Sequence, residues 1–248
     1  MSTREFADGG YKYIPGVFQY SAGVAAADGY EIVRVTFANP IPLAAGFTKL
    51  AEHLAAVGRP KAALCACELR SPAPFSEDGF KSFNLHYVSV LETWGIVRAG
   101  VNPVARTNVC PVITPPSVPG IYAFSYTVPA KQRRPTFIVS GSGEVPEGKS
   151  NYADHIICPG DTSIAGLRSK AEFVLATMEA RMASLGMSWD DATSTQVYTM
   201  HDIHPLLADF FVARGAARFG VTWHYTRPPV AGLDFEMDYR GILTELML

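Results

Sequence analysis

An arginine stands at the start of a predicted strand in the stretch NPVARTNVCP, residues 102–111. Arg106 lies between the small Ala105 and the hydroxyl-bearing Thr107. A guanidinium fork binds a carboxylate through two parallel hydrogen bonds and stays charged at any working pH. Arg106 is therefore a candidate anchor for a carboxylated ligand, and the alternative is an ordinary salt bridge at the surface or between domains. The matching stretch near the other end, residues 218–229, has no arginine at the corresponding point.

Acidic side chains alternate with apolar ones in the stretch DFEMD near the C-terminus. Because side chains on a strand point to opposite faces in turn, Asp234, Glu236 and Asp238 share one face, and Phe235 and Met237 share the other. A partly buried glutamate has a raised pKa, and it can then orient a water molecule or move protons. Glu236 is the candidate for this role, and a solvated acidic face is the competing interpretation.

Further polar residues could take part in catalysis or binding. His224, in TWHYT, faces opposite to its two aromatic neighbours on a strand, and its imidazole titrates near neutral pH, as proton transfer requires. A structural role is the alternative for a lone strand histidine. The stretch VSGSGEVPEG contributes Ser140, Ser142 and Glu144 as candidates to line a cleft, since glycines allow close approach to the backbone. It lacks the Gly-Lys-Ser/Thr ending of a phosphate loop, so a tight turn is the plain alternative.

Neither the cysteines nor the histidines predict a metal site. Cys65 and Cys67 share one face of a predicted strand, and the spacing of the four cysteines does not match zinc ligands. We therefore expect reduced cysteines that act as small apolar side chains. The motif HD-x-H, with His201 and His204, has no third ligand placed by the sequence.

The elements that must position these residues occur twice in the same order. The first half predicts strands at 30–38, 61–71, 106–113 and 120–128 and helices at 42–58 and 78–96. The second half predicts strands at 136–148, 193–200, 221–226 and 233–240 and helices at 160–186 and 203–220. Prolines and charges make 129–135 a linker, so we expect domains at 1–128 and 136–248, each of ordinary size.

Bulk composition excludes several classes of protein. Of the 248 residues 48% are hydrophobic and 18% charged, which suits a well-packed core. The net charge of −2 offers no basic excess to attract nucleic acid. No apolar run approaches the length of a membrane span, and the polar start has no signal-peptide core. We expect a cytoplasmic protein.

Several stretches carry a family resemblance. FIVSGSGEVPEG, the long segment from AEFVLATMEARM to QVYTMHDIH, and RPPVAGLDFEMDYRGI follow one another in the second half. FNLHY and NPVARTNV lie in the first half. In order and spacing these stretches resemble the Rid/YjgF family of enamine/imine deaminases over about residues 30–245.

The resemblance implies an α+β chain of two chorismate-mutase-like domains in tandem. Each domain would carry a mixed sheet with two helices on one face, and domains of this family associate in rings of three with ligand clefts between them. Known members hydrolyse imines or enamines to a ketone and ammonia, and some relatives act on aminomuconate-type dicarboxylates from aromatic degradation. Water is the nucleophile, so no cofactor is implied. With two domains per chain, a homotrimer is the simplest assembly.

The resemblance also assigns roles to residues. Arg106 would hold the carboxylate of a small substrate, Glu236 would give acid–base help, and Asn84 in FNLHY matches the family's helix asparagine. Thr107, Ser140, Ser142 and Glu144 would line the cleft, and His224 would assist proton transfer. Phe124 occupies the glutamate position of the first half, so the two halves divide the motif between them. This division indicates either a composite site between the domains or decay.

Other functions remain open at this point. Chorismate-hydrolysing enzymes and hydroxylaminobenzoate lyases have related folds and also hold a carboxylate with arginine. A protein that binds a metabolite without turning it over is a third possibility, because a fold does not guarantee an activity.

Overall fold

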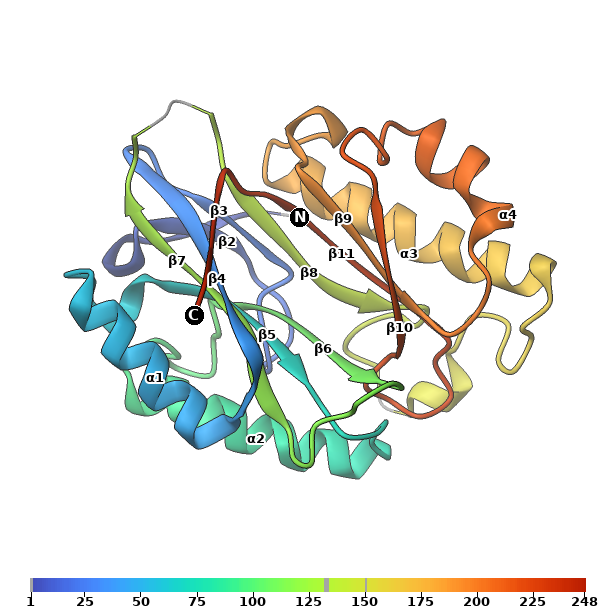
Figure 1. Ribbon diagram of the computed structural model, residues 1–248, viewed down its shortest axis with the longest axis horizontal. Coiled ribbons are helices and arrows are strands. Elements are labelled where there is room, and N and C mark those ends of the chain that lie inside the picture. Colours follow the sequence, from blue (N-terminus) through green and yellow to red (C-terminus); the bar gives the residue numbers. More distant parts are fainter. Residues whose placement is uncertain (1, 132–133, 150) are drawn as a thin grey trace.

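The computed structural model describes residues 2–131, 134–149 and 151–248. Twelve strands of this part of the chain form one mixed sheet, in the order β1-β2-β3-β8-β11-β9-β10-β6-β5-β7-β4-β12. The strands of the two halves lie between two helical layers, with α1 and α2 on one side of the molecule and α3 and α4 on the other (Figure 1). The predicted α+β architecture, with two helices for each half, is thereby confirmed.

The first half follows the predicted order closely. Its elements are β4 (Tyr30–Pro42), α1 (Leu43–Ala56), β5 (Leu64–Arg70), α2 (Glu77–Thr93), β6 (Ala105–Pro111) and β7 (Gly120–Pro129). Ser76 caps α2 by accepting a hydrogen bond of 3.2 Å from the N–H of Gly79, and Glu77 and Asp78 complement the helix dipole in the first turn. The apolar stripe of α2 packs on the sheet through Tyr87 and Leu91, which leaves Asn84 on the same buried face.

The second half repeats this order with one difference. Its elements are β8 (Phe137–Gly143), α3 (Ile164–Ser184), β9 (Ser194–Thr199), α4 (His204–Leu206) with a π-helical turn at Leu207–Val212, β10 (Val221–Arg227) and β11 (Phe235–Gly241). The helix predicted at 203–220 is thus much shorter than expected. Gly215 adopts a φ of 82° and Gly220 a φ of 87°, and this left-handed backbone ends a helix.

The terminal segments cross over between the halves, which the sequence did not predict. Strands β1 (Arg4–Phe6), β2 (Tyr11–Ile14) and β3 (Gly23–Ala26) extend the sheet of the second half, where Val24 pairs with Ile138. Strand β12 (Thr244–Met247) lies parallel to β4 in the first half. The predicted linker 129–135 includes residues 132 and 133, which lie outside the described residues, and the proposed division into 1–128 and 136–248 stays a prediction.

The expectation that Cys65 and Cys67 share one face is wrong. The register of β5 against β7 shifts between Leu64 and Ala66. Such an irregularity inserts a residue and changes which side chains share a face. Cys65 consequently packs in the apolar cluster between the two halves, and Cys67 packs under the helices of the first half. Cys65, Cys67 and Cys110 are buried free thiols.

Contacts near the candidate site residues also hold the halves together. Strand β10 pairs with β6 through Thr226 opposite Pro111. Arg240 of β11 donates a 2.5 Å hydrogen bond to Glu68 of β5, so a buried ion pair joins the sheets. The hydroxyl of Ser140 on β8 accepts a 3.1 Å hydrogen bond from the backbone N–H of Arg106 on β6. These contacts bring β6, β8 and β11 together, and these strands carry the candidate site residues.

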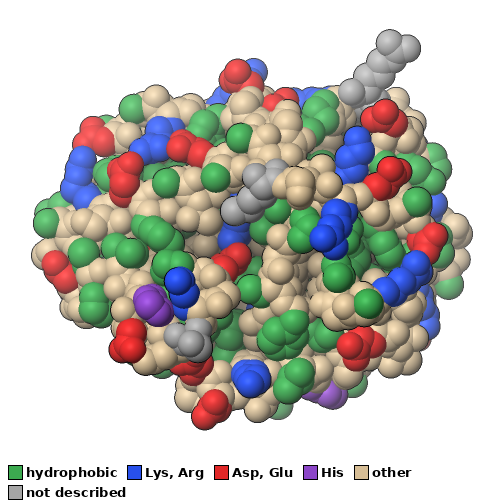
Figure 2. Space-filling view, turned by 180° about the vertical axis from the view of Figure 1, so that it is seen from behind, with side chains coloured by type: hydrophobic (Ala, Val, Ile, Leu, Met, Phe, Trp, Pro, Cys, Tyr) green, Lys and Arg blue, Asp and Glu red, His purple; other side chains and the backbone are tan. Residues whose placement is uncertain are grey.

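The outer surface mixes charges of both signs. On the face seen in Figure 2, Lys and Arg side chains lie among Asp and Glu side chains without a large gathering of either sign. Within the described ranges, no helix combines the length and the apolarity that crossing a bilayer requires.

Candidate active site

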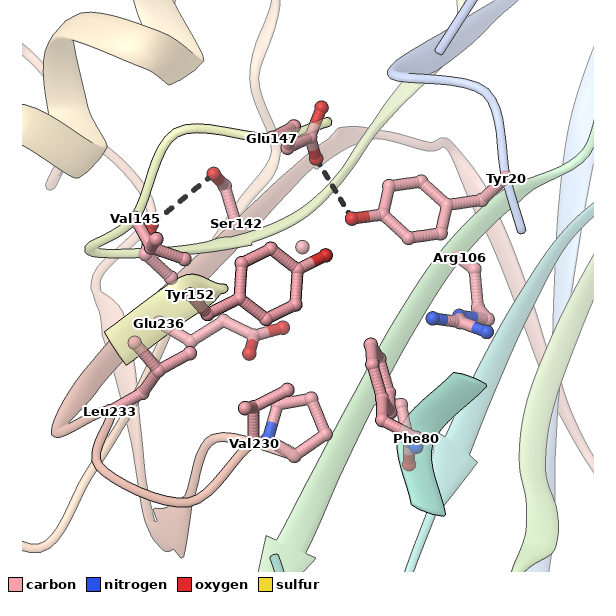
Figure 3. Close-up of a pocket in the computed structure, with 14 residues that line it drawn as sticks. Tyr20, Phe80, Arg106, Ser142, Val145, Glu147, Tyr152, Val230, Leu233 and Glu236 are labelled. Atoms are coloured by element: carbon pink, nitrogen blue, oxygen red, sulfur yellow. Dashed lines mark hydrogen bonds between the residues drawn. The ribbon is translucent and has the colours of Figure 1, made fainter. Parts of the chain in front are cut away.

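A cavity lies where the two halves meet. It is lined by residues of both halves, and Figure 3 shows most of them: Tyr20, Phe80, Arg106, Asn108, Gly141, Ser142, Gly143, Val145, Glu147, Tyr152, Pro229, Val230, Leu233 and Glu236. Half of them are apolar or aromatic, and polar groups lie between them, which suits a small-molecule site. The cavity is therefore the candidate active site.

Arg106 enters this cavity from β6 and is only 3% exposed. One guanidinium nitrogen donates to Oδ1 of Asn84, and the charge lies 4.8 Å from the ring centre of Tyr20 and 5.4 Å from those of Phe80 and Tyr87. Burial lowers the pKa of the guanidinium from its very high ordinary value, which still leaves it charged at neutral pH. Its Nε has no hydrogen-bond partner among the described residues. Arg106 is thus oriented by Asn84 and retains unused donor capacity.

Glu236 reaches toward the same space from β11, on the opposite side of the cavity from Arg106 (Figure 3). Its Oε1 lies directly over Gly141, so that a side chain at position 141 would collide with it. Burial and the nearby Asp238 hold the pKa of the Glu236 carboxyl well above its usual range, and Arg106 opposes the shift. No hydrogen bond to this carboxyl group is formed by the described residues. Glu236 is therefore a buried acid that faces the cavity, and its surroundings favour the protonated form.

Thr107 and Asp238 connect the two strands behind the cavity. The hydroxyl of Thr107 donates a 2.8 Å hydrogen bond to Asp238, and Tyr198 donates another of 2.8 Å to the same oxygen. Burial raises the pKa of Asp238, and Arg240 opposes this shift. Thr107 is outside the cavity lining and holds β6 against β11 instead.

The three residues predicted in the glycine-rich stretch differ in their placement. Ser142 lines the cavity. Ser140 lies behind it, donating to the carbonyl of Ser21 at 2.6 Å while it accepts from the N–H of Arg106. Glu144 lies outside the lining set and accepts hydrogen bonds from the N–H groups of Asp234 and Phe235, at 2.5 and 3.1 Å. Glu144 thereby fixes the start of the strand that carries Glu236.

Glu144 belongs to a charge cluster in which it and Lys170 are buried and Asp234 and His201 are partly exposed. The Lys170 ammonium donates to Asp234 and lies 3.8 Å from Glu144, and His201 contacts Asp234 at 3.1 Å. Burial raises the pKa of Glu144 to about 7, against the opposing hydrogen bonds from the backbone of Asp234 and Phe235. The cluster ties helix α3 to the loop before β11.

His224 is not among the residues that line the cavity. Its Nε2 lies 2.5 Å from Oε1 of Gln196, and its ring stacks on Tyr198 with 4.8 Å between centroids. Burial lowers the pKa of His224 to about 4, and the charge of Arg70 acts in the same direction. The imidazole is therefore neutral at physiological pH and committed to a neighbour.

Sequence reasoning missed the part of the site that comes from irregular segments. The hydroxyl of Tyr20 donates a 2.8 Å hydrogen bond to Glu147, which also pairs with Arg181 at 2.7 Å (Figure 3 shows the first contact). Tyr152 and the apolar cluster of Phe80, Val145, Val230 and Leu233 complete the walls. Arg181 was a detectable signal, since a buried charge on the apolar side of α3 requires an acidic partner.

Each histidine of the HD-x-H motif contacts an aspartate. His204 contacts Asp202 through Nδ1 at 2.5 Å, and His201 contacts Asp234. Within residues 2–131, 134–149 and 151–248, no three His, Cys, Asp or Glu side chains are grouped as metal ligands.

Comparison with known proteins gives a consistent result. A family model described as 2-aminomuconate deaminase CnbZ matches residues 3–246. The 2-amino-5-chloromuconate deaminase of Comamonas testosteroni is 51% identical over 245 residues, which are 98% of this chain and 98% of that protein. A crystal structure of a chorismatase covers 92% of this chain and 78% of its own at 13% identity, with a TM-score of 0.54, and it confirms the expected chorismate-mutase-like fold. The YjgF gene product of E. coli covers 43% of this chain and 80% of its own at 19% identity, with a TM-score of 0.32. The chain belongs to the 2-aminomuconate deaminase family.

Proposed function

We propose that this protein hydrolyses an aminomuconate-type enamine from aromatic-ring degradation to a keto acid and ammonia. One observation carries the proposal. In a chain whose family model spans residues 3–246, Arg106 of the first half and Glu236 of the second half line one cavity. A carboxylate-binding cation and a protonated acid are the two groups that hydrolysis of a carboxylated enamine requires.

Arg106 holds the carboxylate next to the amino-bearing carbon. The rings of Tyr20 and Phe80 flank the guanidinium and exclude water from it, which strengthens its attraction for an anion. Asn84 keeps the fork in one orientation. This anchoring fixes the amino-bearing carbon within the cavity and removes much of the entropic cost of the reaction.

Glu236 supplies and takes back protons. Its acid form protonates the carbon next to the C–N carbon, which converts the enamine to the iminium ion and leaves Glu236 as a carboxylate. That carboxylate removes a proton from a water molecule as the water oxygen bonds to the C=N carbon. The hydroxyl proton of this adduct then passes to the nitrogen, the C–N bond breaks, ammonia leaves, and the oxygen remains as the ketone. The enamine and one water thus yield one keto acid and one ammonia, and Glu236 returns to its acid form.

The test is a substrate panel. Purified protein is mixed in turn with 2-aminomuconate, chorismate and 4-hydroxylaminobenzoate, and ammonia release and ultraviolet absorbance are followed. We expect ammonia only from 2-aminomuconate, in equal amount to the enamine lost. Turnover of chorismate or 4-hydroxylaminobenzoate, or binding of 2-aminomuconate without ammonia release, would refute the proposal.

We also propose that the active form is a trimer of chains in the cytoplasm. The support is architectural, because two related halves per chain complete three-membered rings only when chains associate in multiples of three. Trp223 and Tyr225 of β10 are exposed on an inner strand of the sheet, where an apolar surface suits a neighbour. Sedimentation equilibrium should yield three times the chain mass of 26.9 kDa, and a stable monomer would refute the assembly.

A further inference from the structure

An asparagine in the cavity wall has an unused hydrogen-bond donor. Asn108 lies on β6 and is 2% exposed. Its Oδ1 accepts a 3.0 Å hydrogen bond from the hydroxyl of Ser71, whereas its Nδ2 has no partner among the described residues. A buried donor without a partner is costly, and such groups in native proteins generally have a ligand, a water or a functional reason. Ser71 fixes the amide oxygen and thereby orients the NH2 group.

A second asparagine of the same region shows what a structural asparagine looks like. Asn102 is equally buried, at 2% exposed. Its Nδ2 donates to the carbonyl of Gln19 at 2.8 Å, and its Oδ1 accepts from the N–H of Val104 at 3.0 Å. Both ends of Asn102 are satisfied within the protein, and it does not line the cavity. Asn108 lines the cavity and has only one end satisfied, which indicates that its free end serves a ligand.

The spacing of Asn108 from Arg106 suggests which ligand group it meets. The two residues are two positions apart on one strand, so their side chains leave the same face. Their Cα atoms are about 6.6 Å apart. The terminal carboxyl carbons of an extended six-carbon diacid are separated by five carbon–carbon bonds, which is about 6 Å. The backbone spacing of Arg106 and Asn108 on one strand is thus similar to the separation of the two carboxylates.

Among the described residues that line the cavity, no second cation is available for the distal carboxylate. Among the lining residues, all from the described part of the chain, Arg106 is the only Lys or Arg. The nearby Arg181 pairs with Glu147 at 2.7 Å and donates to the carbonyl of Ser140 at 3.0 Å. The neutral N–H donor of Asn108 is thus the group available for the second carboxylate on the strand that carries Arg106.

We propose that Nδ2 of Asn108 binds the distal carboxylate of a six-carbon conjugated dicarboxylate whose proximal carboxylate lies on Arg106. The assignment rests on the proposed function, since it concerns the same cavity and names its substrate class. Asn108 is accordingly a specificity residue, which separates dicarboxylates from monocarboxylates of the same length.

The test uses two stable ligands that differ only at the distal end. Muconate (hexa-2,4-dienedioate) has both carboxylates, and sorbate (hexa-2,4-dienoate) has a methyl group in place of the second. Neither carries an amino group, so titration calorimetry measures recognition without turnover. We expect the protein to bind muconate more tightly than sorbate by roughly 10- to 100-fold, the range for a hydrogen bond to a charged group.

The variant Asn108→Asp is the sharpest probe, because it keeps the acceptor for Ser71 and replaces the donor by an oxygen. This variant should abolish the preference for muconate and leave the affinity for sorbate within about twofold of the wild type. The retained affinity for sorbate also shows that the variant is folded. Asn108→Ala, which removes both the donor and the acceptor for Ser71, should lower the muconate-to-sorbate ratio toward one. The proposal is overturned if the wild type does not prefer muconate or if both variants keep the wild-type ratio. If the wild type releases no ammonia from 2-aminomuconate, the proposed function is contradicted. If both variants keep the wild-type muconate-to-sorbate affinity ratio, only the role of Asn108 is contradicted.

Discussion

Thr107 donates a 2.8 Å hydrogen bond to Asp238, and this contact joins the strand that carries Arg106 to the strand that carries Glu236. Thr107 directly follows Arg106, and Asp238 lies two positions after Glu236; Arg106 and Glu236 both line the cavity. The relative position of cation and acid therefore depends on a bond that contacts no substrate.

Replacing Thr107 by valine should weaken both stability and turnover. The buried Asp238 would keep Tyr198 but lose one of its two donors, which costs about 1–3 kcal/mol of unfolding free energy. Urea denaturation measures the stability, and steady-state kinetics measure kcat/KM. Thr107→Ser is the matched control, because it retains the hydroxyl. Equal effects of valine and serine would show that the methyl group matters and the hydrogen bond does not.

Replacing Arg106 by lysine should reduce kcat/KM for 2-aminomuconate by roughly 10- to 100-fold. Lysine keeps the positive charge but cannot form two parallel bonds to a carboxylate or donate to Asn84 in the same geometry. Initial rates of ammonia release over a range of substrate concentrations give the value. Arg98→Lys, at an exposed ion pair with Asp8, is the control that should leave the rate unchanged. Wild-type kinetics in Arg106→Lys would remove the guanidinium from the reaction.

The rate should fall as the pH rises through the raised pKa of Glu236. Only the protonated form can donate to the enamine carbon, and burial keeps that form populated above the usual range of a carboxyl group. Glu236→Gln removes the acid and should lower kcat by roughly 100- to 10,000-fold. A pH–rate profile of both proteins checks this prediction. A variant with wild-type rates and the same alkaline limb would assign the proton transfer to another group.

Glu144 should make the protein less stable as the pH rises from about 5 to about 7. Its pKa in the folded protein is about 7 against an ordinary 4.5, so the unfolded chain loses its proton first and is favoured as the pH rises. The contribution of Glu144 is full at acid pH and is lost through that window, with a size of about 1–3 kcal/mol.

The variant Glu144→Gln isolates this effect from other titrating groups, including Lys170, Asp234 and His201 in the same cluster. The unfolding free energy of the wild type minus that of the variant should decrease between pH 5 and pH 7. A difference that does not change with pH would mean that Glu144 is ionised in the folded protein throughout.

His224→Gln should keep kcat/KM within about threefold of the wild type and leave the pH profile unchanged. The pKa of His224 is about 4, the ring is hydrogen bonded to Gln196, and the residue does not line the cavity. A shift in the acid limb of the profile would instead support the proton-transfer role that its sequence position suggested.

Local patterns were sufficient to predict the elements that form the core. Helices α1, α2 and α3 and the strands β4 to β11 appear where periodicity and capping placed them, because their apolar faces are continuous in sequence. Arg106 and Glu236 could be identified because each lies in a regular strand with an unusual residue type. The early termination of the helix predicted at 203–220 fits the left-handed backbone of Gly215, although a single glycine in a helical pattern is a weak signal.

The remainder depends on long-range contacts that no local pattern contains. Tyr20 meets Glu147 across 127 positions of chain, and both lie in segments without periodicity. Strands β3 and β12 have four residues each, too short for a pattern to stand out. The opposite packing of Cys65 and Cys67 depends on one irregularity in strand pairing that their spacing could not reveal.

The exchange of terminal strands has a consequence for the integrity of the whole molecule. If the chain were cut near residue 130, the leading piece would lack β12 beside β4, and its β1–β3 ribbon would lose β8, the strand that pairs with β3. In the trailing piece, β8 would lack β3 and β12 would lack β4. Neither fragment should survive alone, and the two should regain structure only when mixed. Heating the intact chain should accordingly melt both halves in a single step, although each resembles an independent module.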